Sequence, residues 1–310
     1  MTSAIKLAIV GVGKIVYDQH VPAIAARADD FSLVATASRH HTIDHIPGFT
    51  SIEAMLAAHP DIDAVSLCMP PQYRYAAARQ ALAAGKHVLL EKPPGATLAE
   101  VADLAAFAAE KGVTLFASWH SRHAPGVQPA KAHLAAHAPT AVQVRWQEDV
   151  HQWHPNQDWI WQAGGLGVFD PGINALSILT EILPSAVFLT QATLAFPENR
   201  EAPIAADLHF QDAADIKVHA EFDWRPAGQQ GWDIIVTTAG GELRLTDGGA
   251  RLWINGAGQA LAQEAEYLSL YRRFAALIRA GQSDVDVAPL RHVADAFMLG
   301  RRKAVAAFYD

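Results

Sequence analysis

The first third of the chain alternates short apolar runs with longer stretches of helical periodicity. Ile5–Val10 is a continuous apolar run, which is typical of a strand buried on both faces of a parallel sheet. Further strands are predicted over Phe31–Ala37, Asp63–Cys68, His87–Leu90 and Val113–Ser118, and helices over Ile52–Ala58, Gln72–Ala84 and Leu98–Glu110. This regular alternation predicts a doubly wound parallel sheet of the Rossmann type over residues 1–122.

The remainder of the chain changes to the two-residue period of half-buried strands. From Ile216 to Trp224 every second residue is apolar, which indicates an antiparallel sheet with one solvated face. Strands are predicted over Ala141–Glu148, Val187–Phe196, Ile204–Phe210, Ile216–Trp224, Asp233–Thr237, Glu242–Leu245 and Leu252–Ile254, and helices over Val127–Ala136, Tyr267–Arg279 and Leu290–Phe308. We therefore expect an α/β protein whose second domain, residues 123–310, is α+β with a large open, mainly antiparallel sheet. The last helix is expected to pack back on the first domain.

A glycine motif follows the first predicted strand directly. Residues 11–16 have the spacing Gly-x-Gly-x-x-Val, in which the first glycine permits a tight turn and the second lets the backbone approach a pyrophosphate. The next helix would offer its N-terminus to that anion. Val16 stands where such motifs usually carry a third glycine, and a plain strand–turn–helix can show the same pattern. With the alternation around it, the motif predicts a dinucleotide site at Gly11, Gly13, Lys14 and Ile15.

The residues after the second strand indicate which nucleotide is bound. NAD-binding chains usually place Asp or Glu there to hold the ribose 2′-hydroxyl, whereas this chain has Ser38-Arg39-His40-His41. Ser38 and Arg39 can hold a 2′-phosphate, Arg39 through a charge-assisted fork. NADP is therefore the preferred cofactor, with NAD tolerated. The alternative is that Arg39 is an ordinary solvated loop residue.

Polar and proline-rich segments follow the next three strands. Pro70 and Pro71 would stiffen a wall beside the ribose and nicotinamide. Glu91-Lys92-Pro93 follows the fourth strand, and ligands on such sheets bind at the carboxyl ends of the strands. Lys92 is therefore expected to face the ligand, with Pro93 pinning its backbone through a cis bond if the turn requires one. The alternative is a surface lysine in a turn. His120 ends the fifth strand.

A glycine-rich stretch, residues 164–174, runs into an apolar helix expected over Ile173–Leu183. Asp170 and Asn174 are four residues apart, so on a helical turn they face the same way and place a potential acid/base beside an amide. Asp170-Pro171 could also simply cap and start the helix. The residues just upstream favour a functional site, because they are unusually rich in aromatic and imidazole groups: Trp153, His154, Trp159 and Trp161.

Composition narrows the partners of this 310-residue chain. A net charge of −8 with scattered basic residues argues against a nucleic-acid or anionic-lipid surface. No apolar run reaches the roughly 18 residues of a membrane span. The lone Cys68 is typical of a reducing compartment, so a cytoplasmic protein is expected. The spacing of His133, His137 and His209 predicts no metal cluster, and no metal is expected.

Three motifs together resemble a known family. The Gly-x-Gly turn, Glu91-Lys92-Pro93 and the Gly-Gly-x-x-x-x-Asp-x-x-x-Asn pattern of residues 164–174 are similar to the glucose–fructose oxidoreductase and inositol dehydrogenase superfamily. The similarity is closest to its bacterial L-arabinose and D-galactose 1-dehydrogenases. It spans nearly the whole chain and is specific over residues 145–174. Many superfamily members carry His where this chain has Asn174, so a histidine acid/base is excluded at that position.

The resemblance implies NAD(P)-dependent oxidation of an aldose of the L-arabinose, D-galactose or D-fucose type at C1 to its lactone. A hydride passes to the nicotinamide, Asp170 takes the O1 proton, Lys92 stabilises the developing negative charge, and Asn174 orients the sugar. A sugar also needs flat aromatic walls and fixed polar partners, for which the candidates are His120, Glu148, Trp153, His154 and Trp232. Core packing is the alternative for each tryptophan.

Two other functions and an assembly state remain open. A dehydrogenase of another polyol, such as an inositol or a dihydrodiol, would use the same fold. A non-catalytic NAD(P)-sensing regulator would also share it, although the presence of both Lys92 and Asp170 speaks against that class. The open sheet can pair with its copy, so a homodimer or homotetramer is expected.

Overall fold

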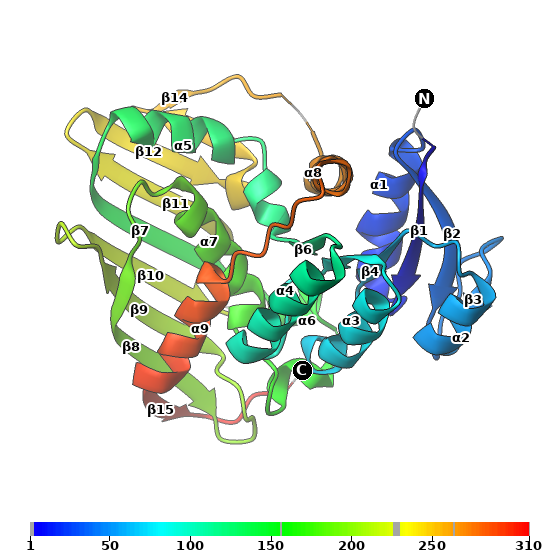
Figure 1. Cartoon of the computed structure of the whole chain (residues 1–310). Helices are drawn as coiled ribbons and strands as arrows, with labels where there is room; N and C mark the ends of the chain where they lie inside the picture. Colours follow the sequence, from blue (N-terminus) through cyan, green and yellow to red (C-terminus); the bar gives the residue numbers. More distant parts are fainter. Residues whose placement is uncertain (1–2, 156, 226–229, 263, 310) are drawn as a thin grey trace. The chain divides into compact units, whose positions relative to one another are not determined.

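The computed structural model describes residues 3–155, 157–225, 230–262 and 264–309. The chain divides into two units (Figure 1). Unit 1 comprises Met1–His120 and Ala265–Val287, and unit 2 comprises Ser121–Glu264 and Ala288–Asp310. The expected domains of residues 1–122 and 123–310 therefore differ from these units chiefly in the segment Ala265–Val287.

Unit 1 is built on a six-stranded parallel sheet with the order β3-β2-β1-β4-β5-β6. This order, in which successive strands are added on either side of β1, confirms the predicted doubly wound Rossmann sheet. The strands are β1 Ile5–Val10, β2 Phe31–Ala37, β3 Gly48–Phe49, β4 Ala64–Leu67, β5 His87–Leu90 and β6 Leu115–Ala117. The short edge strand β3 is an addition that the apolar pattern does not reveal.

Helices cover both faces of this sheet. Ala8 and Val10 of β1 are buried with α2 Ile52–Ala58, α3 Arg74–Ala83 and α4 Leu98–Lys111. Leu7 and Ile9, on the opposite face of β1, are buried with η1 Val16–His20, α1 Val21–Ala26 and α8 Glu266–Ala280. Burial on both faces explains why the strands read as continuous apolar runs.

The helix that joins unit 1 from late in the chain is α8, not the last helix. Its residues Leu270, Tyr271 and Phe274 are fully buried in the core that contains β1. The helix expected over Leu290–Phe308 is α9 Ala288–Leu299, which ends before Gly300. The following residues form β15 Arg301–Val305, paired in parallel with β8 Phe188–Pro197 of unit 2. That part of the prediction is wrong because strand pairing at a sheet edge overrides local helical periodicity.

Unit 2 is built on a nine-stranded, mainly antiparallel sheet with the order β14-β13-β12-β11-β7-β10-β9-β8-β15. Among the strands formed by the described residues of this sheet, the β7–β10 and β8–β15 pairs alone are parallel. Its other strands are β7 Pro139–Gln147, β9 Ala205–Gln211, β10 Lys217–Asp223, β11 Gly231–Thr238, β12 Gly241–Thr246, β13 Arg251–Ile254 and β14 Ala257–Gly258. The expected open α+β sheet is present.

Three helices of unit 2 lie against one face of this sheet: α5 Val127–Ala136, α7 Phe169–Ile182 and α9 (Figure 1). Phe222 of β10 faces them and contacts Phe169, while Phe210 of β9 contacts His292 of α9. Alternate residues such as Lys217 and Glu221 lie on the other face and are exposed. The two-residue period thus separates a helix-covered face from a polar face.

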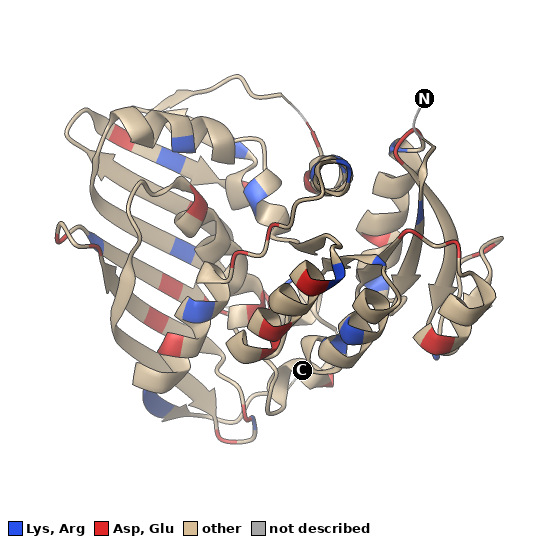
Figure 2. Ribbon diagram, in the orientation of Figure 1, with Lys and Arg blue, Asp and Glu red and all other residues tan. Residues whose placement is uncertain are grey.

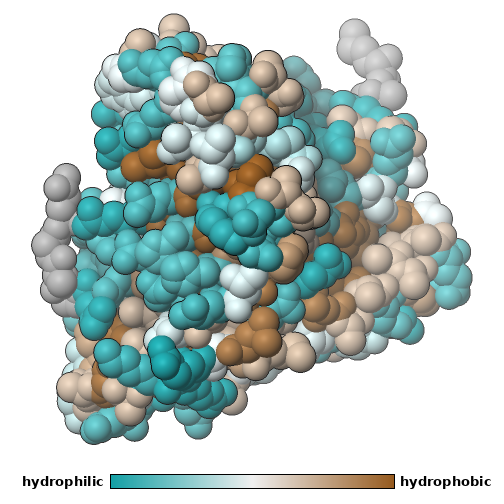
Figure 3. Space-filling model, turned by 90° about the vertical axis from the view of Figure 1, so that its left-hand side faces the viewer, coloured by the Kyte–Doolittle hydropathy of each residue, from teal (hydrophilic) through white to brown (hydrophobic). Residues whose placement is uncertain are grey.

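The surface carries mixed charge. Lys and Arg residues are interspersed with Asp and Glu along the ribbon rather than gathered on one element (Figure 2). On the side drawn in Figure 3, hydrophilic residues cover much of the surface and hydrophobic residues gather in patches between them. None of the helices formed by the described residues combines the length and the apolar character needed to cross a bilayer.

Candidate functional site

The glycine turn after β1 has the backbone that a dinucleotide site requires. Gly11 has φ +85°, and a Cβ there would lie 2.6 Å from the backbone nitrogen of Met69, so only glycine fits. At Gly13 an added Cβ would meet nothing within 4 Å, which leaves the backbone open to a ligand. Helical structure starts at Lys14, so the first amides of the helix adjoin this open turn. These features fit a bound pyrophosphate. Lys14 and Ile15 are exposed, and the Lys14 ammonium pairs with Asp18.

The end of β2 fits the 2′ end of the nucleotide. The Ser38 amide donates to the carbonyl of Phe49 in β3 at 2.8 Å, which fixes the backbone beside Arg39. Arg39 is exposed, and within the described part of the chain its guanidinium forms no ion pair. An uncommitted guanidinium at this strand end is suited to a phosphate monoester.

Arg74 holds together the loops that follow β4 and β5. Its side chain is buried, and its guanidinium donates to the backbone carbonyls of Met69, Glu91 and Pro93. The Lys92–Pro93 peptide is cis, and Lys92 is half-buried. Arg74 thereby fixes the proline wall of Pro70 and Pro71 relative to Lys92. Sequence reasoning missed it. The available signal was a cation in the first turn of a helix, where the helix dipole disfavours positive charge.

Glu91, the residue before Lys92, is the centre of a buried polar network. Its carboxylate accepts from the Tyr267 hydroxyl at 2.6 Å and contacts His20 Nε2 at 3.2 Å, and it also accepts from the backbone N–H of Lys92 at 2.6 Å. His20 Nδ1 lies 2.7 Å from the hydroxyl of Tyr271. Two elements distant in sequence, η1 and α8, therefore fix the backbone from which the Lys92 side chain projects.

The network keeps Glu91 charged. Burial alone would raise the pKa of its carboxyl, but the hydrogen bond and positive charge of His20, together with the Tyr267 hydroxyl, lower that pKa from 4.5 to about 2. Burial alone would lower the pKa of His20, but interactions with Cys68, Tyr271 and Glu91 raise it well above 6.5. Both pKa shifts therefore indicate a protonated His20 opposite an ionised Glu91.

His120 is held near this network by α8, since its ring stacks on Tyr267 and its Nδ1 lies 2.6 Å from Glu266.

In unit 2 the glycine-rich stretch delivers Asp170 into the first turn of α7. The helix starts at Phe169, four residues earlier than predicted, with Val168 as its N-cap. Asp170 is therefore not the capping residue. Gly167 has φ +53°, and a Cβ there would meet the carbonyl oxygen of Pro203 at 2.3 Å, so a larger residue would displace this turn. Asp170 is buried and Asn174, one turn later, is half-buried.

A carboxylate–imidazole–carboxylate row adjoins Asp170. His154 Nδ1 lies 3.6 Å from the Asp170 carboxylate, and His154 Nε2 lies 3.5 Å from the Glu148 carboxylate. These are ion-pair distances, longer than good hydrogen bonds. His154 is only 18% exposed, so little solvent separates its ring from the two carboxylates.

Glu148 organises the tryptophans. Its two carboxylate oxygens accept from the indole N–H groups of Trp224 at 3.0 Å and Trp232 at 2.9 Å. Trp153 packs edge-on against Trp232, with ring centroids 5.8 Å apart, and is 44% exposed. Trp153 is therefore not a core residue, whereas Trp224 is fully buried and supports the cluster. Trp224 was not singled out from sequence, because a tryptophan ending an alternating strand looks like ordinary core.

The predicted site residues thus fall into two sets, and each set is held in place by one unit. Unit 1 holds the dinucleotide residues with Lys92 and His120, and unit 2 holds Asp170 and Asn174 with the aromatic and polar residues Glu148, Trp153, His154 and Trp232. The first set has the features of a nucleotide-binding oxidoreductase, and the second those of a site for a small polar substrate.

Comparison with known proteins agrees with this class. Residues 5–118 match the GFO/IDH/MocA model, described as an oxidoreductase family with an NAD-binding Rossmann fold. A galactose 1-dehydrogenase of Pseudomonas fluorescens is 47% identical over 306 residues, covering 99% of both chains. A crystal structure of a D-galactose-1-dehydrogenase from Rhizobium etli superposes with a TM-score of 0.96 at 67% identity, covering 100% of this chain and 99% of that one. A trans-1,2-dihydrobenzene-1,2-diol dehydrogenase of Bos taurus is 32% identical over 169 residues, covering 53% of this chain and 48% of the other.

The fold and the nucleotide turn therefore define an NAD(P)-binding dehydrogenase. The chain belongs to the GFO/IDH/MocA family of oxidoreductases, as the sequence motifs predict.

Proposed function

We propose that the protein oxidises an aldose at C1 to the aldonolactone, with D-galactose, L-arabinose and D-fucose as candidate substrates. The observation that carries this proposal is the similarity, over essentially the full chain, to proteins named as galactose dehydrogenases. The three sugars share their configuration at C2 to C4, so one arrangement of hydrogen-bond partners can accept them all.

The residues of the chain divide the work of this reaction. The dinucleotide, when bound, accepts the hydride from C1. Asp170 accepts the O1 proton, and His154, 3.6 Å from its carboxylate, helps to orient that carboxylate. Lys92, on a backbone fixed by Glu91 and Arg74, holds O1 and stabilises the negative charge that develops there. Asn174 orients the sugar, His120 and Glu148 offer polar contacts, and Trp153 and Trp232 offer flat apolar surface to the C–H face of the ring.

We further propose NADP as the preferred cofactor, with NAD accepted. Gly11 and Gly13 would hold the pyrophosphate, Ser38 and Arg39 the 2′-phosphate, and Pro70 and Pro71 the ribose and nicotinamide side. The support for NADP is an exposed Arg39 on a backbone pinned by β3, with no acidic residue at Ser38, Arg39, His40 or His41.

We expect the enzyme in the cytoplasm, as a homodimer or homotetramer formed through the unit 2 sheet. Light scattering coupled to size-exclusion chromatography measures the oligomer directly. A mass of about 33.4 kDa, that of one chain, at micromolar concentration would contradict the assembly.

A substrate panel tests the proposed activity. D-Galactose, L-arabinose, D-fucose, D-glucose, myo-inositol and a trans-dihydrodiol are each supplied with NADP and with NAD, and formation of the reduced cofactor is followed at its absorbance band. We expect the three sugars with the shared C2–C4 configuration to be oxidised with the highest kcat/KM. Preference for inositol or the dihydrodiol would support a polyol dehydrogenase instead. Tight NADP binding with no turnover of any compound would favour a regulator.

A further inference from the structure

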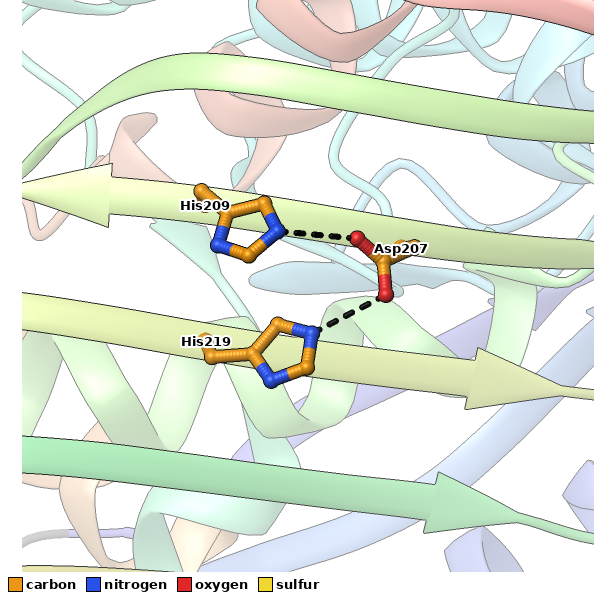
Figure 4. A group of neighbouring side chains, drawn as sticks. All are labelled: Asp207, His209 and His219. Carbon is orange, nitrogen blue, oxygen red and sulfur yellow. Dashed lines mark hydrogen bonds and ion pairs between the residues drawn. The ribbon is translucent and has the colours of Figure 1, made fainter.

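The polar face of the unit 2 sheet carries a compact group of three potential metal ligands: Asp207, His209 and His219 (Figure 4). Asp207 and His209 are two residues apart on β9 and so point to the same face. His219 on β10 lies directly opposite His209 in the antiparallel register. Spacing along the sequence does not reveal this group, because the hairpin pairs His209 with a residue ten positions away.

The contacts within the group match the scale of a coordination sphere. Asp207 Oδ1 lies 3.0 Å from His209 Nε2, and Asp207 Oδ2 lies 2.9 Å from His219 Nε2. One ligand atom from each residue lies within 4.8 Å of the other two. The ligand atoms of a tetrahedral zinc site, each about 2.0–2.1 Å from the ion, are separated by about 3.3 Å. Small side-chain rotations therefore suffice for the three residues to bind one ion.

The two imidazoles are already aligned. Their rings stack with centroids 4.6 Å apart and planes 6° apart, so both Nε2 atoms face the same carboxylate. The three side chains are between 31% and 45% exposed, which leaves room for water to complete the coordination. All three ligands come from one chain, so the site does not depend on a second copy.

The surrounding charge also favours a cation. Glu221 of β10 lies directly opposite Asp207, and two like charges in that position destabilise a sheet. Arg145 of β7 lies opposite Glu221, but its Nε donates to Gln147 at 2.9 Å. A bound divalent ion would offset the repulsion between the two carboxylates.

Other clusters within the described part of the chain lack this convergence. His154 contacts Asp170 and Glu148 through opposite ring nitrogens, so those groups do not point to one position. His133 and His137 of α5 stack at 4.2 Å, but among the described residues no carboxylate joins them to form a group of three.

We propose that Asp207, His209 and His219 bind one divalent transition-metal ion per chain. Two imidazoles and one carboxylate suit Zn²⁺ and its neighbours Co²⁺ and Ni²⁺ rather than Mg²⁺ or Ca²⁺, which prefer sets of oxygen ligands. The ion lies on the sheet face opposite the one that α7 covers, so it has a structural role and takes no part in the oxidation.

Calorimetric titration with ZnCl₂ tests the site. The full chain is purified without a histidine tag, stripped with a chelator and exchanged into a non-coordinating buffer. We expect one Zn²⁺ per chain with an affinity on the order of micromolar, and no heat with MgCl₂. Asp207→Asn and His219→Gln should each weaken Zn²⁺ binding at least about tenfold. The matched control His133→Gln, which removes one ring from the other stacked pair, should bind Zn²⁺ as the unaltered protein does.

A melting curve of each variant without metal verifies that it folds, since all three ligands lie at the surface. Added Zn²⁺ should raise the melting temperature of the unaltered protein and of His133→Gln but not that of the two ligand variants. Failure of the unaltered protein to bind Zn²⁺ would overturn the proposal. So would Zn²⁺ binding that Asp207→Asn and His219→Gln leave unchanged.

Discussion

Asp170 offers the sharpest test at the scale of single residues. It lies inside the first turn of α7, after the N-cap Val168, so its loss removes no side-chain cap. Asp170→Asn keeps the size and much of the hydrogen bonding but is not a base at neutral pH. We expect it to melt within a few degrees of the unaltered protein and to bind NADP, while kcat falls at least about 100-fold. Near-normal turnover would make Lys92 the better candidate for the proton acceptor.

Arg39 tests the cofactor assignment. Because its guanidinium is exposed at the end of β2, Arg39→Ala should leave the fold intact. The variant loses a charge-assisted contact worth about 1.5–3 kcal/mol, so KM for NADP should rise about 10- to 100-fold while KM for NAD barely changes. Steady-state kinetics with each cofactor measures both constants. Equal increases for NADP and NAD would remove Arg39 from the 2′-phosphate site.

Trp153 tests the sugar wall. At 44% exposure its truncation should cost little stability, far from the roughly 3–5 kcal/mol of a core tryptophan. Trp153→Ala should raise KM for galactose much more than the dissociation constant for NADP. Trp253→Ala is the matched control, because Trp253 is 37% exposed on β13, outside the candidate site. A similar loss of sugar affinity in both variants would indicate a nonspecific effect.

At the scale of elements, α8, η1 and β5 meet at the Glu91 network, and its charge makes stability depend on pH. The pKa of Glu91 is about 2 in the folded chain against 4.5 for a free glutamate, a difference that corresponds to about 3 kcal/mol. A lowered pKa stabilises the fold above pH 4.5, and this contribution disappears as the pH falls from 4.5 towards 2. The raised pKa of His20 acts in the opposite sense, since its contribution is complete below pH 6.5 and is lost as the pH rises through the folded value.

Glu91→Gln tests how much the charge of the Glu91 carboxylate contributes to the free energy of unfolding. At pH 6 the variant should be less stable than the unaltered protein by about 3 kcal/mol, because His20 and Tyr267 lose their charged partner. The gap should narrow as the pH falls below 4.5. Urea unfolding at pH 6, 4.5 and 3.5 gives the free energies of unfolding. A gap independent of pH would mean that Glu91 is not held ionised by this network.

The predictability of the elements follows from how each is stabilised. β1, β2 and β5 match their predicted bounds because burial on both faces leaves an unbroken apolar run. The sequence pattern predicts a helix beyond Leu299, where the structure has β15. This strand was not foreseeable, since its pairing with β8 joins residues about a hundred positions apart. His20 and Tyr267 were not foreseeable for the same reason, because their common partner Glu91 is brought to them only by the folded chain.

At the scale of the whole molecule, the residues proposed from sequence for the dinucleotide lie in unit 1, and Asp170, Asn174 and the aromatic residues lie in unit 2. Motif spacing located Lys92 and Asp170, because each adjoins a strand end or glycine turn with its own signature. Spacing along the sequence could not show that the Glu148 carboxylate accepts hydrogen bonds from Trp224 and Trp232. It also could not show that His154 lies beside both Glu148 and Asp170. Those contacts depend on strands β7, β10 and β11 being neighbours, which only the fold determines.

The central claim is that the bond broken in the sugar is the C1–H bond. D-Galactose carrying deuterium at C1 tests it directly: the enzyme and NADP are supplied in a single reaction, and both products are examined by mass spectrometry. We expect the deuterium to move to the reduced cofactor and the sugar product to be an unlabelled galactonolactone or the acid formed from it by hydrolysis. Deuterium retained in an oxidised sugar would show that oxidation occurs at another carbon and would contradict the assignment.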